Sequence, residues 1–446
     1  MKKQVTLYHT NDIHSGFKQW SRIVSHIKNN RSPDMRYIDL GDHADRSNPM
    51  TEATAGHANI ELLNAAGVDF VTIGNNEGVT FSKEMLERMY GQASFKVVVA
   101  NLLDVETGKE PKWAVPYLVD TMDNGLRIGY IGFTAAMIYF YEQLGWEVSF
   151  SISKLKEMVE FLAPKTDAIV LLSHLGLPKD EMIAREVQGI AAIIGAHTHH
   201  ALPNGKTVNN TVIAQAGKHG NYLGELTLTF SNNQLYEVKE TLLDPALFER
   251  DEETFTLLQV LEEQSQIALS EPAVYLSRPL EIDWFHWSES GQELCDALTT
   301  WCKEEIGMLN AGVLLERLPA GPVTNGDIHR ICPHPINPCI VELNGIELKE
   351  TIERAQTDEI VQLQLKGFGF RGKVLGLMLF SGIEITAKGI FIQGKPIQAE
   401  QSYRLATLDM YTFGFLFPHI AEAANKTYLL PEFLRDVLFA MLKNRN

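Results

Sequence analysis

The residues best suited to chemistry in this sequence are carboxylates, amides and imidazoles that follow short apolar segments. The first such segment, at residues 5–8, leads into Asp12-Ile13-His14. In an extended D-x-H tripeptide the two polar side chains lie on the same side of the chain, so one carboxylate and one imidazole converge. This arrangement presents two metal ligands from one strand end. Taken alone, it is also compatible with an ordinary polar loop.

The same pattern recurs along the first half of the chain. Apolar segments expected as strands lie at residues 35–40, 70–73, 97–100, 128–133, 168–172 and 190–194, and helical periodicity appears at residues 20–30, 59–67 and 152–164. Helices that alternate with strands predict an α/β fold with largely parallel pairing. In such sheets, ligands bind beyond the carboxyl ends of the strands.

Five of these strand ends carry seven side chains with oxygen or nitrogen donor atoms: Asp12, His14, Asp42, Asn75, His174, His197 and His199. One polar residue at a strand end is usually a turn former, but seven that point into one crevice indicate a metal site. Mixed imidazole and oxygen ligands suit manganese, zinc, iron or cobalt better than calcium or magnesium. Two such cations sharing a carboxylate would activate a bridging water and neutralise a phosphoryl group, so hydrolysis of a phosphate ester fits best.

Composition narrows the remaining classes of function. A length of 446 residues predicts two domains, and 45% hydrophobic with 21% charged residues is typical of a globular protein. The net charge of −17 argues against binding a nucleic acid polymer. No apolar run reaches the length of a membrane span, and the N-terminus lacks the apolar region of a signal peptide, so we expect a cytoplasmic location. The cysteines, Cys295, Cys302, Cys332 and Cys339, lack zinc-site spacing and are expected to be reduced.

The motifs D-x-H, G-D, G-N-x-E, a strand-end histidine and G-x-H-x-H resemble those of the calcineurin-like metallophosphoesterases. Over its full length the chain resembles the two-domain 5′-nucleotidase family, which includes UDP-sugar hydrolases and 2′,3′-cyclic nucleotide phosphodiesterases. The resemblance implies a calcineurin-like α/β sandwich at residues 1–240, a linker helix at 241–272, and a C-terminal α/β 5′-nucleotidase domain that binds substrate at 273–446.

The resemblance also implies roles for individual residues. One metal would be held by Asp12, His14 and His199. The second would be held by Asn75, His174 and His197, with Asp42 bridging the two. Asn101, after the segment at 97–100, matches a position that the family uses near the phosphate.

Asn76 departs from the family pattern, in which a histidine at this position bonds to the phosphate or the leaving oxygen. Asparagine can donate a hydrogen bond there but cannot deliver a proton, and general-acid help is worth about 10²–10⁴-fold in rate. Loop residues that could replace the acid are His43, Asp45 and Arg46, with His200 a weaker candidate. Alternatively, a good leaving group such as a phosphate anhydride needs no acid.

The second domain also departs from the family. The family motif N-G-G-x-x-R reads Asn310-Ala311-Gly312-Val313-Leu314-Leu315, without the final arginine, which Arg317 could replace. Leu377 stands where the family tends to have a phenylalanine that stacks on a base. Tyr411 and Phe413 could still supply such stacking.

These observations predict a dinuclear metal-dependent hydrolase that cleaves phosphoester or phosphoanhydride bonds of nucleotides or related small molecules. A 5′-nucleotidase, a cyclic phosphodiesterase and a nucleotide-sugar hydrolase remain open within this class. The alternative is a catalytically weak nucleotide- or metal-binding regulatory protein, suggested by Asn76, Leu315 and Leu377. No membrane partner is expected, and the sequence does not indicate the oligomeric state.

Overall fold

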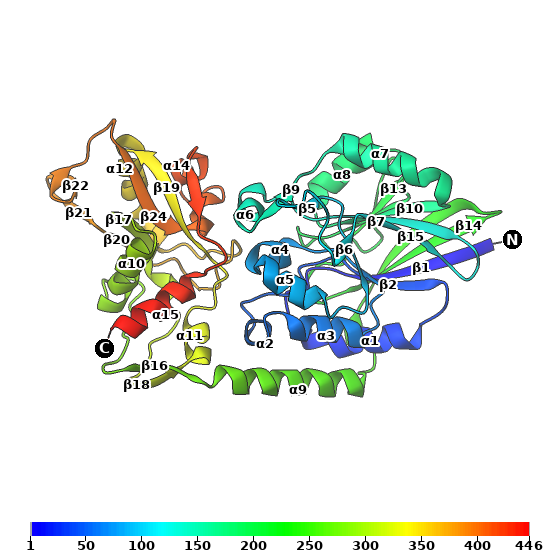
Figure 1. Cartoon of the computed structure of the whole chain (residues 1–446), viewed down its shortest axis with the longest axis horizontal. Coiled ribbons are helices and arrows are strands. Elements are labelled where there is room, and N and C mark those ends of the chain that lie inside the picture. The colour runs from blue at the N-terminus through cyan, green and yellow to red at the C-terminus, as the bar shows by residue number, and fades with distance from the viewer. Residues whose placement is uncertain (1, 446) are drawn as a thin grey trace. The chain divides into compact units, whose positions relative to one another are not determined.

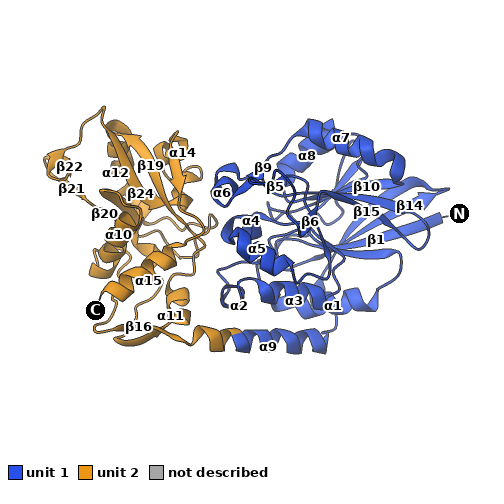
Figure 2. Cartoon of the chain, in the orientation of Figure 1, with its two compact units in different colours: residues 1–264 blue, residues 265–446 orange. Residues whose placement is uncertain are grey.

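The computed structural model describes residues 2–445, and the chain divides into two compact units, Met1–Gln264 and Ser265–Asn446 (Figures 1 and 2). The division lies inside helix α9 (Glu252–Leu269), within the segment predicted as a linker helix. Both units mix helices and strands, so the predicted α/β class is confirmed. No helix among residues 2–445 is long and apolar enough to cross a membrane.

The first unit contains two large sheets. The first has the order β15 (Gln234–Leu243), β14 (Leu223–Ser231), β1 (Lys2–Thr10), β2 (Met35–Asp39), β3 (Phe70–Val71), β4 (Lys96–Val98) and β6 (Ala114–Val115). The second has the order β12 (Lys206–Val208), β13 (Thr211–Ala214), β11 (Ala192–Gly195), β10 (Ala168–Ser173), β8 (Arg127–Phe133) and β7 (Tyr117–Thr121). Strands β1 to β4 and β6 are parallel, as are β8, β10, β11 and β13.

The alternation of side chains along a strand explains how the second sheet is covered on both faces. On β10, Val170 and Leu172 belong to a core that also contains Val5 and Leu7 of the first sheet. Ile169 and Leu171 face the opposite side and pack in a second core with α7 (Ile152–Leu162) and α8 (Leu177–Glu186). The five strand ends that carry the predicted ligands therefore come from two facing sheets. The sequence alone did not show which strands belong to which sheet.

The remaining helices of the first unit are α1 (Trp20–Asn29), α2 (Pro49–Ala53), α3 (His57–Ala65), α4 (Asn75–Thr80), α5 (Lys83–Tyr90) and α6 (Ile138–Gln143). Helix α1 buries Trp20, Ile23, Val24 and Ile27, the apolar positions whose spacing predicted it. Helices α2, α4, α5, α6 and α8 were not anticipated, and a small two-stranded antiparallel sheet pairs β5 (Leu102–Asp104) with β9 (Trp146–Val148).

The second unit is built on a five-stranded sheet of order β20 (Met378–Ser381), β17 (Ile306–Asn310), β24 (Ser402–Leu408), β19 (Pro338–Asn344) and β25 (Lys426–Tyr428). Its helices are α10 (Glu289–Trp301), α11 (Asn325–Ile331), α12 (Gly345–Ala355), α13 (Asp358–Val361), α14 (Pro418–Glu422) and α15 (Leu434–Asn444). Two smaller sheets pair β16 (Pro272–Leu276) with β18 (Gly321–Thr324), and β21 (Ile383–Thr386), β22 (Gly389–Ile392) and β23 (Lys395–Pro396) in turn. All four cysteines are buried in this unit as free thiols.

Candidate metal centre

The seven predicted metal ligands stand at the carboxyl ends of β1, β2, β3, β10 and β11. Asp12 and His14 follow β1, Asp42 follows β2, and Asn75 begins α4 just after β3. His174 directly follows β10, and His197 and His199 follow β11. Two sheets whose parallel strands end on the same side thus gather ligands that are up to 187 residues apart in sequence.

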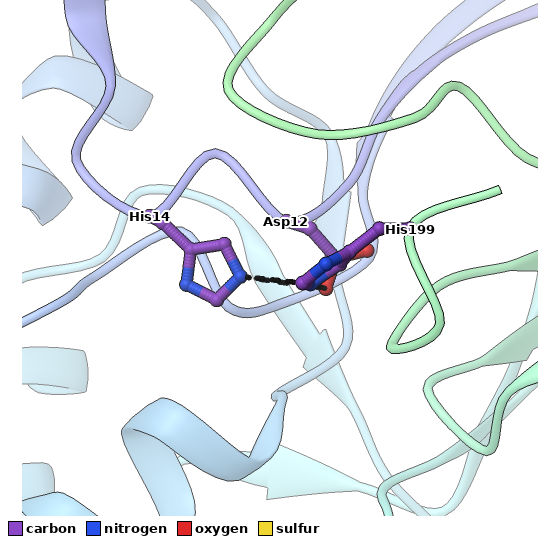
Figure 3. A group of neighbouring side chains, drawn as sticks. All are labelled: Asp12, His14 and His199. Atoms are coloured by element: carbon purple, nitrogen blue, oxygen red, sulfur yellow. Dashed lines mark hydrogen bonds and ion pairs between the residues drawn. The ribbon is translucent and has the colours of Figure 1, made fainter. Parts of the chain in front are cut away.

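Asp12, His14 and His199 form the first group that could hold a cation (Figure 3). The Nε2 atoms of the two imidazoles lie 3.1 Å apart. Oδ1 of Asp12 lies 3.4 Å from Nε2 of His199 and 3.8 Å from Nε2 of His14. The ligand atoms of all three side chains therefore face one point.

Asp12, Asp42 and His174 form a second group. Nε2 of His174 lies 3.5 Å from Oδ1 of Asp42 and 3.9 Å from Oδ1 of Asp12. The other oxygen of Asp42, Oδ2, lies 3.8 Å from Nε2 of His14 in the first group. Asp42 thus presents one oxygen to each group, which is the geometry that a bridging ligand needs.

His174 shows that this centre fits a cation. Its Nδ1 donates a hydrogen bond to the Leu40 carbonyl at 2.6 Å, so Nε2 is the nitrogen that faces the carboxylates, and in the neutral imidazole its lone pair is available to a cation. Nε2 is buried and has no hydrogen-bond partner among residues 2–445, although two carboxylates face it. Burial alone would lower the pKa of this imidazole, but Asp42 and Asp12 outweigh it and raise the pKa to about 10. A positive charge is therefore favoured at this point, and either a proton on Nε2 or a divalent cation bound to the neutral imidazole can supply it.

Asn75 and His197 lie together beside the second group. Oδ1 of Asn75 is 2.7 Å from Nδ1 of His197, and the backbone N–H of His197 donates to the Asp12 carboxylate at 3.0 Å. The structure therefore brings all seven predicted ligands into one cluster.

Glycines and one buried glutamate hold the β2 and β3 ends against each other. A Cβ on Gly74 would lie 2.0 Å from Oδ1 of Asp42, and one on Gly41 would lie 2.1 Å from the Gly74 nitrogen, so neither position tolerates a side chain. Glu77 accepts hydrogen bonds from the backbone N–H groups of Asp42, Ala44 and Gly74. The sequence motif contained Glu77, but no role was assigned to it.

Five of the seven ligands have left-handed backbone conformations, which are rare outside glycine. The φ angles are 51° for Asp12, 47° for His14, 51° for Asp42, 72° for His197 and 58° for His199. Such conformations cost of order 1–3 kcal/mol each and concentrate at functional sites. The backbone therefore adopts unfavourable conformations at these five positions, and these conformations bring the side chains to one point.

The comparisons with known proteins agree with this geometry. The model of the calcineurin-like phosphoesterase family matches residues 5–201, and that of the 5′-nucleotidase C-terminal domain matches residues 277–416. The uncharacterised metallophosphoesterase YunD of Bacillus subtilis is 42% identical, over 98% of this chain and 99% of its own length. The chain belongs to the two-domain 5′-nucleotidase family.

Solved structures show the same fold. The NAD nucleotidase of Haemophilus influenzae aligns with a TM-score of 0.70 at 15% identity, over 99% of this chain and 96% of its own. A putative 5′-nucleotidase of Staphylococcus aureus also gives 0.70, at 17% identity, over 100% and 97% of the two chains. The protein is thus a metallophosphoesterase, a metal-dependent phosphoester hydrolase of a family that binds two divalent cations.

The residues considered as replacements for the family's acid lie in different surroundings. His43 points into an aromatic contact with Trp20, and burial lowers its pKa to about 3. Arg46 bonds to the Glu52 carboxylate and the Thr80 carbonyl. Asp45 is buried, with Oδ2 3.7 Å from Nδ1 of His14, and His200 is exposed and contacts the Thr198 hydroxyl. Of these four side chains, only that of Asp45 has a described contact, at 3.7 Å, with a predicted ligand, His14.

His219 is a residue near the cluster that the sequence reasoning missed. Its ring centroid is 5.7 Å from that of His14. Its backbone N–H donates to the Asp12 carbonyl at 2.8 Å, and its Nδ1 lies 3.4 Å from the Ile13 carbonyl. His219 follows no predicted strand, so nothing in the sequence indicated its contacts with the backbone of the D-x-H tripeptide.

Tyr141 of α6 is a second contact that the sequence did not reveal. It is fully buried, and a Cβ on Gly78 would lie 1.9 Å from its hydroxyl oxygen. The Tyr141 ring therefore fills the space beside α4, the helix that begins with the ligand Asn75.

The predicted substrate-binding residues are placed as follows. Both amide atoms of Asn101 bond to the backbone of Thr134. In the second unit, Tyr411 is fully buried and donates from its hydroxyl to Oδ1 of Asn310 at 2.6 Å, so its ring is not accessible for stacking. Arg317 is exposed. The Phe413 ring lies nearly parallel to that of Phe368, with centroids 5.9 Å apart.

His334 connects the two segments around these residues. Its Nε2 donates to the Val313 carbonyl at 2.9 Å, and its Nδ1 accepts from the Arg371 backbone N–H at 2.9 Å. Val313 belongs to the Asn310–Leu315 motif, and Arg371 follows the Phe368 loop. Protonation of Nδ1 would set a donor against a donor, and burial accordingly lowers the pKa of His334 to about 3.

We predict that replacing Gly78 by alanine destabilises the first unit by about 1–3 kcal/mol, because the added methyl group overlaps Tyr141. It should also weaken metal binding, since α4 carries Asn75. Denaturant unfolding and metal titration measure the two effects. In a Tyr141→Ala background the same substitution should cost little, because the overlapping ring is gone. Purely additive effects of the two substitutions would contradict this contact.

The lowered pKa of His334 predicts an acid-dependent loss of stability. Between its ordinary value of about 6.5 and about 3, the unfolded chain binds a proton that the folded chain does not, so stability falls as the pH falls through this range. The expected contribution is on the order of 1 kcal/mol per pH unit. Denaturant unfolding at pH 7.5, 6 and 5 should show a shallower pH dependence for His334→Gln than for the wild type. The exposed His286→Gln variant is the control and should keep the wild-type slope.

Proposed function

We propose that this protein hydrolyses phosphoester or phosphoanhydride bonds of nucleotides at the cluster of seven ligands. The observation that carries the proposal is the buried Nε2 of His174, which has no hydrogen-bond partner among residues 2–445 and faces the carboxylates of Asp42 and Asp12. A divalent cation bound at this point would neutralise the two carboxylates and accept the Nε2 lone pair of the neutral imidazole.

Asp12, His14 and His199 would hold one cation, and Asn75, His174 and His197 the other, with Asp42 shared. When bound, the pair would supply an activated water near neutral pH and neutralise charge on the phosphoryl oxygens. The donor set favours manganese, zinc, iron or cobalt. The chain contributes the orientation of these ligands, which the Leu40 carbonyl, Gly41, Gly74 and Glu77 maintain.

The second unit supports a nucleotide-like substrate. Phe368 is 42% exposed and has φ 54°, an unusual conformation for an aromatic residue, between Gly367 and Gly369. Its ring and that of Phe413 are inclined by only 13°. Two nearly parallel rings, one exposed and one partly buried, suit stacking on a flat heterocycle, because every base has a π-face. We therefore infer that Phe368 joins Phe413 in stacking on a base, in place of Tyr411 and Leu377.

The deciding experiment combines metal analysis with phosphate release in added manganese. The substrates are 5′-mononucleotides, ADP, UDP-glucose and 2′,3′-cyclic AMP. Products of UDP-glucose and 2′,3′-cyclic AMP are followed by chromatography, because the first hydrolysis of these two substrates frees no inorganic phosphate. We expect about two metals per chain and turnover of one substrate class. Asp42→Asn should lose metal and activity together, whereas Asp123→Asn, an exposed carboxylate in a turn, should keep both. Full activity of Asp42→Asn would disprove the assignment of the bridging ligand.

Replacing Phe368 or Phe413 by alanine should raise KM for the preferred nucleotide. Base stacking is worth about 1–3 kcal/mol, so the increase should be roughly five- to a hundredfold. KM for a generic aryl phosphate should change much less. Phe415→Ala is the matched control, because this ring is 57% exposed and lies two residues from Phe413. Equal changes for both substrates, or an equal effect of Phe415→Ala, would rule out stacking by this pair.

A further inference from the structure

Asn76 contacts two of the predicted ligands at once. It is the second residue of α4, and its backbone N–H donates to Oδ1 of Asp42 at 2.7 Å. Its side-chain amide nitrogen lies 2.9 Å from Nδ1 of His14. Among residues 2–445 the amide makes one further polar contact, a long one of 3.5 Å from the amide nitrogen of Asn75 to Oδ1. The Asn76 side chain is thus directed at His14.

When the site binds a cation, the protonation of His14 determines which atom donates and which accepts in its contact with Asn76. Nε2 is the nitrogen that faces His199, Asp12 and Asp42. A neutral imidazole that ligates through the Nε2 lone pair carries its proton on Nδ1. That proton needs an acceptor, and the carboxylate of Asp45 is 3.7 Å away, beyond hydrogen-bond distance. The Asn76 amide is the group within reach.

We propose that Asn76 is a positioning residue whose Oδ1 accepts the Nδ1–H hydrogen bond of His14 and so orients this imidazole toward the cation. The inference rests on the proposed two-metal site. It requires the amide oxygen, rather than the nitrogen, to face His14. Rotation of the amide by half a turn exchanges the two atoms without moving the rest of the residue, because they occupy equivalent positions. The backbone bond to Asp42 is unaffected by that rotation, which gives up only the 3.5 Å contact from the amide nitrogen of Asn75.

This role differs from that of a proton donor. The amide atom that faces His14 is committed to a ligand, so it does not also contact the leaving oxygen. Partners of this kind fix the tautomer and direction of a ligating histidine, and their loss typically costs about 10–100-fold in metal affinity. Asn76 therefore acts on the reaction through His14.

The test is calorimetric titration of Mn²⁺ into chelator-treated protein. Asn76→Leu has a similar size but no acceptor, and we expect its Mn²⁺ affinity to fall about 10–100-fold. Asn76→Asp keeps an acceptor oxygen and should bind at least as tightly as the wild type. Thr80→Val is the matched control: the Thr80 hydroxyl bonds to the Asn76 carbonyl, so this variant perturbs the same helix but leaves the amide in place. It should bind Mn²⁺ like the wild type.

A second measurement starts from the wild-type protein. In the zinc-loaded, ¹⁵N-histidine-labelled wild type, long-range ¹H–¹⁵N spectra should show His14 protonated at Nδ1, with that proton protected from exchange. Protection should be lost in Asn76→Leu and kept in Asn76→Asp. Wild-type protein that binds two cations, together with undiminished affinity in Asn76→Leu or an unprotected His14 proton, would overturn the role of Asn76 alone. Wild-type protein that binds no divalent cation would instead overturn the proposed function.

Discussion

The first unit is governed by one electrostatic constraint: two buried carboxylates, Asp12 and Asp42, share the same small space with the unpaired Nε2 of His174. Like charges at such distances are unfavourable in a buried environment, so the arrangement needs positive charge between them. Two pKa shifts follow from this arrangement. Burial alone would lower the pKa of His174 and raise that of Asp42, but the neighbouring opposite charges reverse both shifts. A structure that only had to be stable would not gather these groups.

The surrounding chain is arranged to hold these groups in place. Gly41 and Gly74 let two loop backbones touch, and Glu77 joins them through three backbone hydrogen bonds. The ligands' left-handed backbone angles show that local conformational preference is overridden there. The two facing sheets supply the rigidity for this, because their shared apolar core fixes the strand ends from which the loops depart.

The strand ends and their ligands could be predicted from sequence because apolar segments and the polar residues after them are local patterns. The helix at residues 20–30 was predictable for the same reason, and it is observed as α1. The contacts of Tyr141 with Gly78 and of His219 with the Asp12–Ile13 backbone join segments 63 and more than 200 residues apart, and no local pattern reports them. In the second unit, aromatic residues were recognisable, but whether a ring is buried, as in Tyr411, or accessible, as in Phe368, depends on tertiary packing.

Helix α4 supports the cluster through contacts of three of its residues. Asn76 places an amide against His14, and Gly78 lacks a side chain just where the Tyr141 ring approaches. Asn75 on the same helix remains beside His197. The packing and the hydrogen bonds around the helix thus keep the predicted ligands together. A divalent cation that bound at this cluster would meet groups that α4 already holds in place, which lowers the cost of ordering them on binding.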